Sequence, residues 1–401
     1  MPLAEAPASY EQLRERYRRE LFDEQLPFWH RFGIDHERGG FCCSLDYDGR
    51  RVNDEKFTWF QGRGLWVYSF LYNHLQPDPG YLETARRTKE FLLAHAPQPD
   101  GSWASNLSRE GAPLAPEADF YGRYFAVEGL LEYSHAANDE QAHETALRMF
   151  KDLFRRETAA GASGPITQGF WMVNINIARQ ILDRESDPET AEIADRAVDA
   201  VIHKHYNPDF GLNNEQLYRD FTRPREEATK CNFGHSIETL WMVMEEARRR
   251  GDTPLWRTCA ERIRHHLDVG WDWLYGGLAM WINVDQGAYE WPVEVVPGTD
   301  LAFQAVGEYN YTKTLWALDE ILVASLLIHE RTGAAWAREF FDRTQQIIDD
   351  KFSMKAAAGQ PTYVLFADRR ITAPPHSSRQ DNYHRLRALM LNLTTLDRLA
   401  G

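Results

Sequence analysis

The chain lacks the features that define several classes of protein. Basic residues are few: 45 Lys and Arg stand against 60 Asp and Glu, which gives a formal net charge of −15. A nucleic-acid-binding protein would need a basic stripe, so we expect no nucleic-acid partner. No uninterrupted apolar run approaches the roughly 20 residues of a membrane-spanning helix. We therefore expect no membrane partner. Residues 1–10 show neither the basic nor the apolar region of a signal peptide, so we expect none.

Cysteine and metal-binding motifs are also scarce. The four cysteines fit neither the CxxC spacing of a zinc site nor a disulfide framework; they are Cys42, Cys43, Cys231 and Cys259. We therefore expect a reduced, cytoplasmic protein. The sequence contains no HExxH motif and no carboxylate cluster with metal spacing, so we predict no metal. The Gly-rich segment GASGPITQG (161–169) lacks the lysine of a phosphate-binding loop, so we predict no nucleotide and no other cofactor.

Aromatic residues are the abundant class. They make up 13% of the chain, with 13 Trp and 17 Tyr. Tyr and Trp carry a polar tip on an apolar body, so they suit cavities that hold polar, ring-shaped ligands. The alternative is a large aromatic core, and composition alone does not decide between the two.

Apolar residues recur at helical spacing along about twelve segments. The odd-numbered segments carry a charged face, whereas the even-numbered segments are mostly apolar. A helix that is apolar all round must be surrounded by protein, and one with a charged face lies at the surface. The segments cover residues 9–32, 61–75, 81–95, 119–134, 139–157, 169–182, 188–203, 233–249, 254–267, 311–329, 334–350 and 381–399.

This alternation predicts an all-α fold, the (α/α)6 barrel, in which six pairs of one outer and one inner helix close a ring. A helical solenoid is the alternative, but the sequence has no fixed-period repeat and no polar capping unit at either end. We therefore expect one barrel domain spanning residues 1–401. The aromatic, non-helical segment 270–307 should be a functional loop, as long loops in compact domains usually are.

Polar residues gather near the starts of the predicted inner helices. If these helices run the same way, their starts converge at one mouth of the barrel and form a polar pocket with an aromatic wall. Residues three apart, such as His235 and Glu238, share one helix face. The set is Arg63 on the second helix, His235 and Glu238 on the eighth, Lys313, Trp316 and Glu320 on the tenth, and His384 and Arg387 on the twelfth.

Each of these residues also has a purely structural interpretation. A single histidine on an apolar helix is more often a satisfied core residue than a catalyst. Arg63 at a helix start opposes the macrodipole, which favours either a function or a buried ion pair. Glu238 and Glu320 could simply pair with Arg63 and Lys313. The coincidence of such residues on several even-numbered helices, and not on the odd-numbered ones, favours a site.

The same segments resemble the N-acylglucosamine 2-epimerase family, whose members include cellobiose 2-epimerases and mannose-type aldose–ketose isomerases. The similarity begins at Asp35 and the GGF of residues 39–41, and it covers nearly the whole chain. It continues through WFQGRGLWVY (59–68), DFYGRYFAVEGLLEY (119–133), GHSIE (234–238), KTLWALDE (313–320) and YHRLRALM (383–390). The motifs are short, but together and in order they make a strong match, and the family fold is the (α/α)6 barrel.

The resemblance implies roles for particular residues. The essential arginine of the family's QGR motif falls on Arg63. The first catalytic histidine, in GHxxE, falls on His235 with Glu238 beside it. The acidic residue of the tenth helix falls on Glu320, and the second catalytic histidine falls on His384, with Arg387 completing that motif.

The chain also departs from the family pattern. The usual second Trp of the tenth-helix motif is Leu315, and the usual proline after the terminal histidine is Leu386. Isomerases and cellobiose epimerases carry an additional histidine on the sixth helix, where this chain has only Asn174 and Asn176. The resemblance therefore favours N-acetylglucosamine and N-acetylmannosamine as substrates. Unmodified glucose, mannose or fructose comes next, and cellobiose last.

The chemistry of C2 inversion suits two histidines. A weakly acidic proton must leave the carbon beside an aldehyde, and a proton must return on the other face of a planar enediolate. Histidine titrates near working pH and each ring can donate or accept, so we expect His235 and His384 to be the pair. Arg63 would stabilise the enediolate oxygen, while Glu238 and Glu320 would orient the histidines, assist ring opening or bind hydroxyls. The expected substrate-binding residues are Trp59, Trp66, Tyr121, Asn174, Lys313, Trp316 and Arg387.

Two functions from other classes remain alternatives at this stage. A glycoside hydrolase would need two carboxylic acids across the scissile bond, such as Glu238 and Glu320, but would not need the histidines and Arg63 beside them. A non-catalytic sugar- or protein-binding module is the other, since animal members of the family are known as renin-binding proteins. The intact histidine pair favours catalysis on a small-molecule sugar. The resemblance also allows a homodimer, which the sequence itself does not show.

Overall fold

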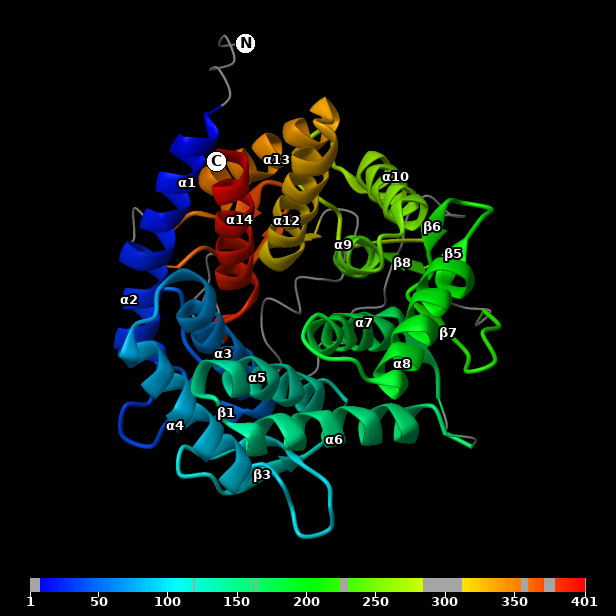
Figure 1. The fold of residues 1–401 in the computed structure, drawn as a ribbon. Helices are drawn as coiled ribbons and strands as arrows, with labels where there is room; N and C mark the ends of the chain where they lie inside the picture. Colours follow the sequence, from blue (N-terminus) through cyan, green and yellow to red (C-terminus); the bar gives the residue numbers. More distant parts are fainter. Residues whose placement is uncertain are drawn as a thin grey trace.

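The computed structural model describes residues 8–117, 120–159, 161–162, 164–223, 230–283, 312–354, 360–370 and 379–400. These residues form a double ring of helices, seen along its axis in Figure 1. The inner ring consists of α3 (Thr58–Phe70), α5 (Tyr121–Ala137), α7 (Gln168–Leu182), α9 (Phe233–Arg250), α12 (Leu315–Thr332) and α14 (His384–Ala400). The outer ring consists of α1 (Tyr10–Arg19), α4 (Pro79–His95), α6 (Glu140–Glu157), α8 (Pro188–Asp199), α10 (Thr253–Gly270) and α13 (Ala335–Ile347).

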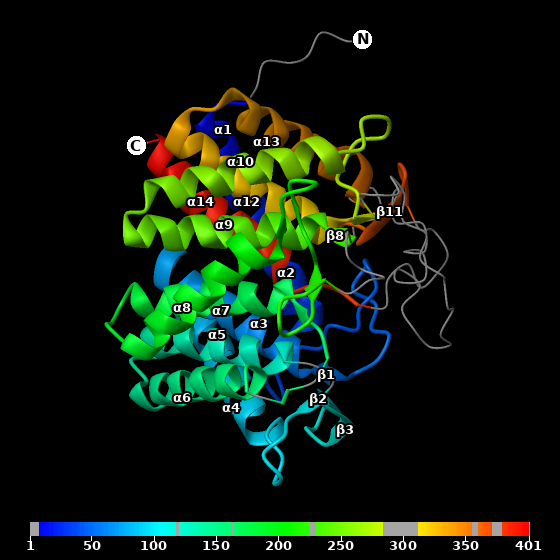
Figure 2. The same ribbon diagram turned by 90° about the vertical axis from the view of Figure 1, so that its right-hand side faces the viewer.

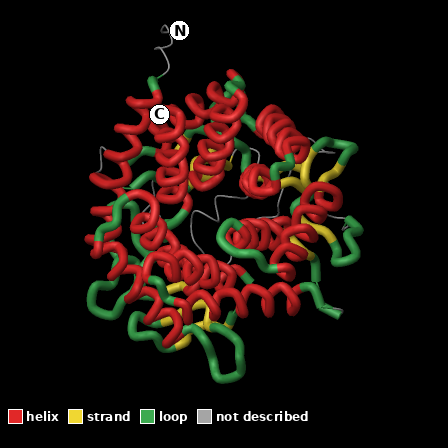
Figure 3. The backbone as a smooth tube through the Cα atoms, in the orientation of Figure 1, coloured by secondary structure: helices red, strands yellow, loops and turns green. Residues whose placement is uncertain are grey.

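Several helices end or continue in π-helical turns. The first outer helix continues through η1 (Glu20–Gln25), α2 (Leu26–Phe28) and η2 (Trp29–Gly33). Among the described residues, the other such turns are η3 (Leu71–Leu75), η4 (Ala200–His205) and η6 (Ile348–Phe352). Figure 3 shows how helices dominate the described chain, with only short strands between them.

The burial of the two rings follows from their sequences. On α12 every residue from Leu315 to Leu326 is buried, as expected for a helix that is apolar all round. On α6 the buried residues recur along one face, at Ala142, Ala146, Phe150 and Leu153. The predicted alternation of outer and inner helices, and with it the (α/α)6 barrel, is confirmed.

Contacts between the first and last helices close the ring and argue against the solenoid. Helix α14 packs against both α12 and α1. At this seam the buried Arg385 donates from Nε to Glu20 on η1 at 2.7 Å and from Nη1 to Asp319 on α12 at 2.8 Å. A buried arginine needs such partners because an unpaired charge in the interior is costly. The first outer helix and the last inner helix therefore pack side by side.

Short antiparallel strands lead into most inner helices, and the sequence did not predict them. The leading strands are β1 (Lys56–Phe57), β4 (Ile166–Thr167), β8 (Lys230–Asn232) and β10 (Thr312–Thr314). They belong to the sheets β1–β2–β3, β4–β7, β8–β9 and β10–β11–β12, and β5 pairs with β6. The other strands are β2 (Ala104–Leu107), β3 (Pro113–Pro116), β5 (Tyr206–Asn207), β6 (Leu212–Asn213), β7 (Gln216–Leu217), β9 (Trp281–Asn283), β11 (Val364–Phe366) and β12 (Arg369–Arg370). The labelled strands β1, β2, β3, β8 and β11 gather at one end of the ring, where the inner helices begin (Figure 2).

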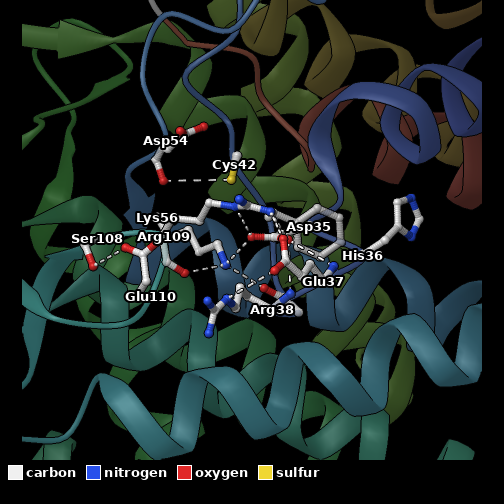
Figure 4. A network of polar contacts seen from close by, with 12 residues as sticks. Asp35, His36, Glu37, Arg38, Cys42, Asp54, Lys56, Ser108, Arg109 and Glu110 are labelled. Carbon is white, nitrogen blue, oxygen red and sulfur yellow. Dashed lines mark hydrogen bonds and ion pairs between the residues drawn. The ribbon is translucent and has the colours of Figure 1, made fainter.

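An ion-pair network holds the Gly-rich segment 35–51 at this end (Figure 4). The buried Asp35 accepts from Arg109 Nε at 2.8 Å and pairs with the fully buried Lys56 at 3.0 Å. Lys56 also donates to the carbonyl of Gly39 at 2.8 Å. Burial alone would raise the pKa of Asp35, but the hydrogen bonds and charges of Arg109 and Lys56 outweigh it and hold that pKa well below its usual range. The network joins this segment to β1, which contains Lys56, and to the turn between β2 and β3, which contains Arg109.

Two sequence-based boundaries need correction. Helix α3 begins at Thr58 and not at residue 61, because the polar Thr58 and Gln61 are buried and hydrogen-bond to nearby backbone carbonyls. Of the expected loop 270–307, residues 271–283 form turns and β9, while residues 284–307, with Trp291, lie outside the described part. Within that described part, no helix is long and apolar enough to cross a membrane.

Candidate active site

His384 begins helix α14 and lies in the centre of the inner ring. Its Nδ1 is 2.8 Å from Oε1 of Glu320 on α12, and its Nε2 is 3.3 Å from Nη2 of Arg63 on α3. Asp381, just before the helix, places a carboxylate oxygen 3.8 Å from the same Nε2. Three inner helices therefore meet at one imidazole ring.

His235 lies in the first turn of α9, which the side chain of Asn232 caps by accepting from the His235 backbone N–H at 3.1 Å. Its Nδ1 is 2.8 Å from Oε1 of Glu215, in the turn between β6 and β7. Glu215 is buried, and its backbone is fixed by bonds to Lys230 and Gln168. Both histidines thus have a carboxylate on Nδ1, which fixes the ring orientation.

The indole ring of Trp316, on α12, contacts both imidazoles. Its centroid is 5.2 Å from that of His235 and 5.5 Å from that of His384. Gly234 makes this arrangement possible, because a Cβ there would lie 2.5 Å from Cη2 of Trp316. The glycine of the GHSIE motif is therefore a requirement of close packing between α9 and α12.

Arg63 lies in the second turn of α3, further from the helix start than the sequence suggested. Its guanidinium stacks over three aromatic rings, at 4.7 Å from Trp59, 4.2 Å from Phe125 and 4.8 Å from Tyr383. Its Nη1 is 3.5 Å from Asp381, and its buried Nε has no partner among the described residues. The three rings hold the guanidinium of Arg63 beside His384, and its Nε–H remains available as a hydrogen-bond donor.

Arg387 lies one turn after His384 and joins two acidic residues. Its Nη2 donates to Oε1 of Glu320 at 2.6 Å and also to Oε1 of Glu238. Burial would raise the pKa of Glu320, but the charge of Arg387 and hydrogen bonds from His384 and Arg387 outweigh it and hold that pKa below its usual range. The suggested pairing of Glu238 and Glu320 with Arg63 and Lys313 is not what the structure contains.

The carboxylates of Glu238 and Glu320 and the ring of His384 are close enough to be considered as a metal site. Their ligand atoms lie within 4.8 Å of one another. Arg387, however, binds both carboxylates through one nitrogen. A fixed guanidinium on both carboxylates supplies the positive charge that a metal would bring, so these residues do not fit a metal ion.

The remaining sequence-predicted residues fall into two groups. Tyr121 stacks on Phe125 and contacts Trp59, so these rings line the Arg63 side of the site. Trp66 packs edge-on against Tyr383 and lines a cavity of about 350 Å³ at the opposite end of the inner ring. Trp59 and Tyr121 therefore keep their place near the site, whereas Trp66 lies beneath it.

Two of the expected substrate-binding residues lie elsewhere. Lys313 is in β10, fully buried, and pairs with Asp272 at 2.6 Å, so its charge is already neutralised. Asn174 donates to the carbonyl of Phe170 on its own helix at 2.7 Å. Its neighbour two residues on, Asn176, instead faces the ring centre and donates to Glu128 at 2.7 Å.

Sequence reasoning missed Glu215, Glu128 and Asp381. Glu128 accepts hydrogen bonds from Tyr383 at 2.9 Å, and burial raises its pKa. Glu215 lies 20 positions before His235 in the segment GLNNEQL, which has no helical period. Asp381 lies three residues before His384, and Glu128 lies within the family-like segment 119–133 on a mostly apolar helix, so both offered a local signal.

Comparison with known proteins identifies the family of this chain. The family model described as N-acylglucosamine 2-epimerase (GlcNAc 2-epimerase) matches residues 39–388. An N-acylglucosamine 2-epimerase from Bos taurus is 25% identical over 345 residues, which cover 80% of this chain and 76% of the relative. A cellobiose 2-epimerase from Bacteroides fragilis is 31% identical over 267 residues, covering 61% of this chain and 68% of the relative.

The fold is also that of a solved relative. The structure of cellobiose 2-epimerase from Bacillus thermoamylovorans superposes with a TM-score of 0.80 at 18% identity, covering 96% of this chain and 99% of that one. At this identity the superposition establishes the fold alone. The family match, by contrast, runs from the GGF segment to the last inner helix and includes both histidines. The chain belongs to the N-acylglucosamine 2-epimerase family.

Proposed function

We propose that this protein is a sugar 2-epimerase, an isomerase that inverts C2 of an aldose. The observation that carries the proposal is the pair of histidines, each held by a carboxylate on Nδ1 and both in contact with Trp316. Inversion needs one group to remove the C2 proton and another to return a proton on the opposite face. Two oriented imidazoles supply both groups near neutral pH.

Arg63 stabilises the intermediate in this mechanism. Loss of the C2 proton puts negative charge on the oxygen at C1, and a donor positioned beforehand lowers the cost of that charge. The guanidinium of Arg63 is held by Trp59, Phe125 and Tyr383 and has an unpartnered Nε. Glu320 accepts a hydrogen bond from His384 and so orients its ring. Arg387 donates to both Glu238 and Glu320, and its charge stabilises both carboxylates.

We propose N-acetylglucosamine and N-acetylmannosamine as the substrate pair. The relative from Bos taurus is an N-acylglucosamine 2-epimerase, and α7 carries no histidine. Glucose with mannose, mannose with fructose, and cellobiose are the alternatives, and the relative from Bacteroides fragilis is a cellobiose 2-epimerase. An NMR time course in D₂O over these four sugar systems tests the choice. Loss of the C2–H signal in one sugar alone identifies it.

The histidine pair is tested by His235→Asn and His384→Asn. Each variant should lower turnover by at least the roughly 10²–10⁴-fold typical of a lost acid or base. The matched control is His143→Asn, since His143 also faces a carboxylate, Glu185 at 3.1 Å, but lies on the outer helix α6. The control should keep its turnover. Near-native epimerisation by either folded active-site variant would refute the two-base mechanism.

We also propose a cellular location, a domain organisation and an oligomeric state for the enzyme. The four cysteines are free and buried, and this supports a reduced, cytoplasmic location. We take residues 1–401 as one domain, and a homodimer as the assembly that the family resemblance allows. Sedimentation of the purified protein at several concentrations measures the assembly directly.

A further inference from the structure

The cavity at the opposite end of the inner ring, hereafter the rear cavity, has no role in the proposed mechanism. It measures about 350 Å³, and all six inner helices contribute to its wall, from Trp66 on α3 to Leu391 on α14. Protein interiors are close-packed, with few voids larger than a water molecule. A space of this size inside the ring instead falls within the range of small-molecule sites, roughly 300–1,000 Å³.

Two side chains that line the rear cavity also contact the catalytic groups. Arg387 lines the cavity and donates to both Glu238 and Glu320. Trp241 lines it too, and its Nε1 donates to Oε2 of Glu320 at 2.8 Å. Neither proposed catalytic histidine is among the described residues that line it. The rear cavity is therefore separate from the active site and shares one wall with it.

A row of aromatic rings forms part of the cavity wall. Trp66, Phe70 and His74 recur every four residues along α3 and η3, so they share one helix face, and all three line the cavity. The rings of Trp66 and Phe70 are stacked with centroids 4.8 Å apart, and those of Phe70 and His74 are 4.3 Å apart. Phe70 is only half-buried, although it lies on an inner helix. Such rings pack against the flat apolar side of a ring-shaped ligand.

Helix α7 presents a polar stripe to the same cavity. Asn176, Arg179, Gln180 and Asp183 follow the i, i+3, i+4, i+7 spacing of one helix face, and all four line the cavity. Arg179 donates to Asp183 at 2.8 Å and to Oδ1 of Asn176 at 3.4 Å, which holds the stripe in one arrangement. Gln180 donates to Glu128 at 3.3 Å, and no described residue bonds to its Oε1. An inner helix surrounded by apolar protein would be apolar all round, so this stripe marks a polar space.

The charges around the rear cavity balance, and this favours a neutral ligand. Four arginines and four carboxylates are among the described residues that line it. An anion or a cation would meet as much repulsion as attraction there. A hydroxyl group both donates and accepts hydrogen bonds, so it can use guanidinium N–H groups, carboxylate oxygens and amides together. A ring with several hydroxyls and one apolar side therefore matches the polar stripe on α7 and the aromatic row on α3.

We propose that the rear cavity is a second, non-catalytic binding site for a neutral monosaccharide. The sugar ring packs against Phe70 and Trp66, and its hydroxyls bond to the polar stripe that contains Gln180. The volume lies at the lower end of the range for ligand sites, so it suits one sugar ring better than an oligosaccharide. Binding there does not rest on the proposed epimerase activity, because neither histidine takes part in it.

Methyl NMR of the full chain labelled at Leu and Val detects binding in the rear cavity directly. Val323, Leu327 and Leu391 line the cavity and report on it, and their signals are assigned by their loss when each is replaced by Ile. N-acetylglucosamine, N-acetylmannosamine, glucose and mannose are titrated separately. We expect the three sets of methyl signals to shift and to saturate with at least one of these sugars.

Two variants with a matched control test the position of the site. Thr394→Trp should fill the cavity and abolish the shifts; Thr394 is half-buried, lines the cavity from α14, and donates to the carbonyl of Leu391 on its own helix at 2.7 Å. The control is Thr258→Trp, a half-buried threonine on the outer helix α10 that donates to the carbonyl of Pro254 at 3.1 Å; it should bind sugar like the unmodified protein. Gln180→Met removes the amide at similar length and should raise the Kd of the methyl shifts roughly 2–10-fold, as loss of a hydrogen bond does.

Each outcome decides the proposal. If no sugar gives saturable shifts, the cavity holds water alone and the proposal is wrong. Shifts that persist in Thr394→Trp would be transmitted from the active site through Trp241 and Arg387, and an unchanged Kd in Gln180→Met would equally overturn the site, even if Thr394→Trp does not fold. Saturation by glucuronate or glucosamine alone would overturn the neutral ligand. A protein that epimerises no sugar but shows the shifts would refute the proposed function and leave the second site standing.

Discussion

The charge of Arg387 should be essential to the stability of the barrel. Its side chain is 3% exposed, and one of its nitrogens bonds to both Glu238 and Glu320. Arg387→Gln would leave these two buried carboxylates facing each other without a cation. Removing one partner of a buried ion pair typically costs about 3–5 kcal/mol. That is a large part of the roughly 5–15 kcal/mol by which proteins are stable.

Urea unfolding at pH 7, followed by tryptophan fluorescence, measures this loss. The control is Arg398→Gln on the same helix, whose arginine is 53% exposed and pairs with Glu330. Surface pairs contribute about 0–1 kcal/mol, so the control should unfold near the urea midpoint of the unmodified protein. If Arg387→Gln loses no more free energy of unfolding than Arg398→Gln, the reasoning about the buried carboxylates is wrong.

The pH dependence gives a second check with a defined sign. In the unmodified protein the pKa of Glu320 is held below its unfolded value, so its contribution is complete above about pH 4.3 and is lost as pH falls below that. Without Arg387, burial dominates and raises the pKa of Glu320. In Arg387→Gln, protonation of Glu320 then removes the unpaired buried charge. The difference in unfolding free energy between the unmodified protein and this variant should therefore shrink as the pH is lowered from 7 to 5. A deficit that is constant across that range would contradict this explanation.

Three further substitutions test other parts of the structure. Arg63→Lys should lower kcat by about 10²–10³-fold with stability nearly kept, because the planar guanidinium is the donor proposed for the enediolate; unchanged kcat would contradict that role. Gly234→Ala should push Trp316 from the histidines and lower kcat/KM by roughly 10²-fold. The control is Gly251→Ala, where a Cβ meets open space but a φ of +72° strains alanine; it should lower stability with a far smaller effect on kcat/KM. Asp35→Asn should cost about 3 kcal/mol in urea at pH 7 by leaving the buried Lys56 unpaired. Because the pKa of Asp35 is lowered, its contribution is complete above about pH 3.9 and is lost progressively as pH falls from there towards the folded pKa, so the difference between the two proteins should be smaller at pH 3 than at pH 7 without vanishing.

The sequence predicted the fold because helix periodicity is a local property. The contrast between α6, with one apolar face, and α12, apolar all round, already separates the outer ring from the inner ring. The positions of His235 and His384 near the starts of inner helices followed from the same pattern. Because outer and inner helices alternate along the chain, all inner helices run in the same direction. The starts of α9 and α14, with His235 and His384, therefore lie at the same end of the barrel.

The partners of the site residues could not be predicted in the same way. His235 takes its carboxylate from Glu215, which lies in a turn whose position depends on pairing between β4 and β7. Lys313 has a motif position beside Trp316, yet pleating of β10 turns it to Asp272. Asn174 and Asn176 differ by two positions on one helix and therefore face opposite ways. These outcomes depend on tertiary geometry that one sequence does not encode locally.

The seam between the first and last helices has a consequence for how the protein folds. Arg63 and His384 are 321 positions apart, and Glu20 and Arg385 are 365 apart. Contacts of such high sequence separation form late, because a long loop must close before they stabilise anything. During synthesis, the apolar side of α1, with Leu13 and Tyr17, therefore stays uncovered until α14 has been made. Catalytic competence and protection from aggregation should consequently appear together, in the final step of folding.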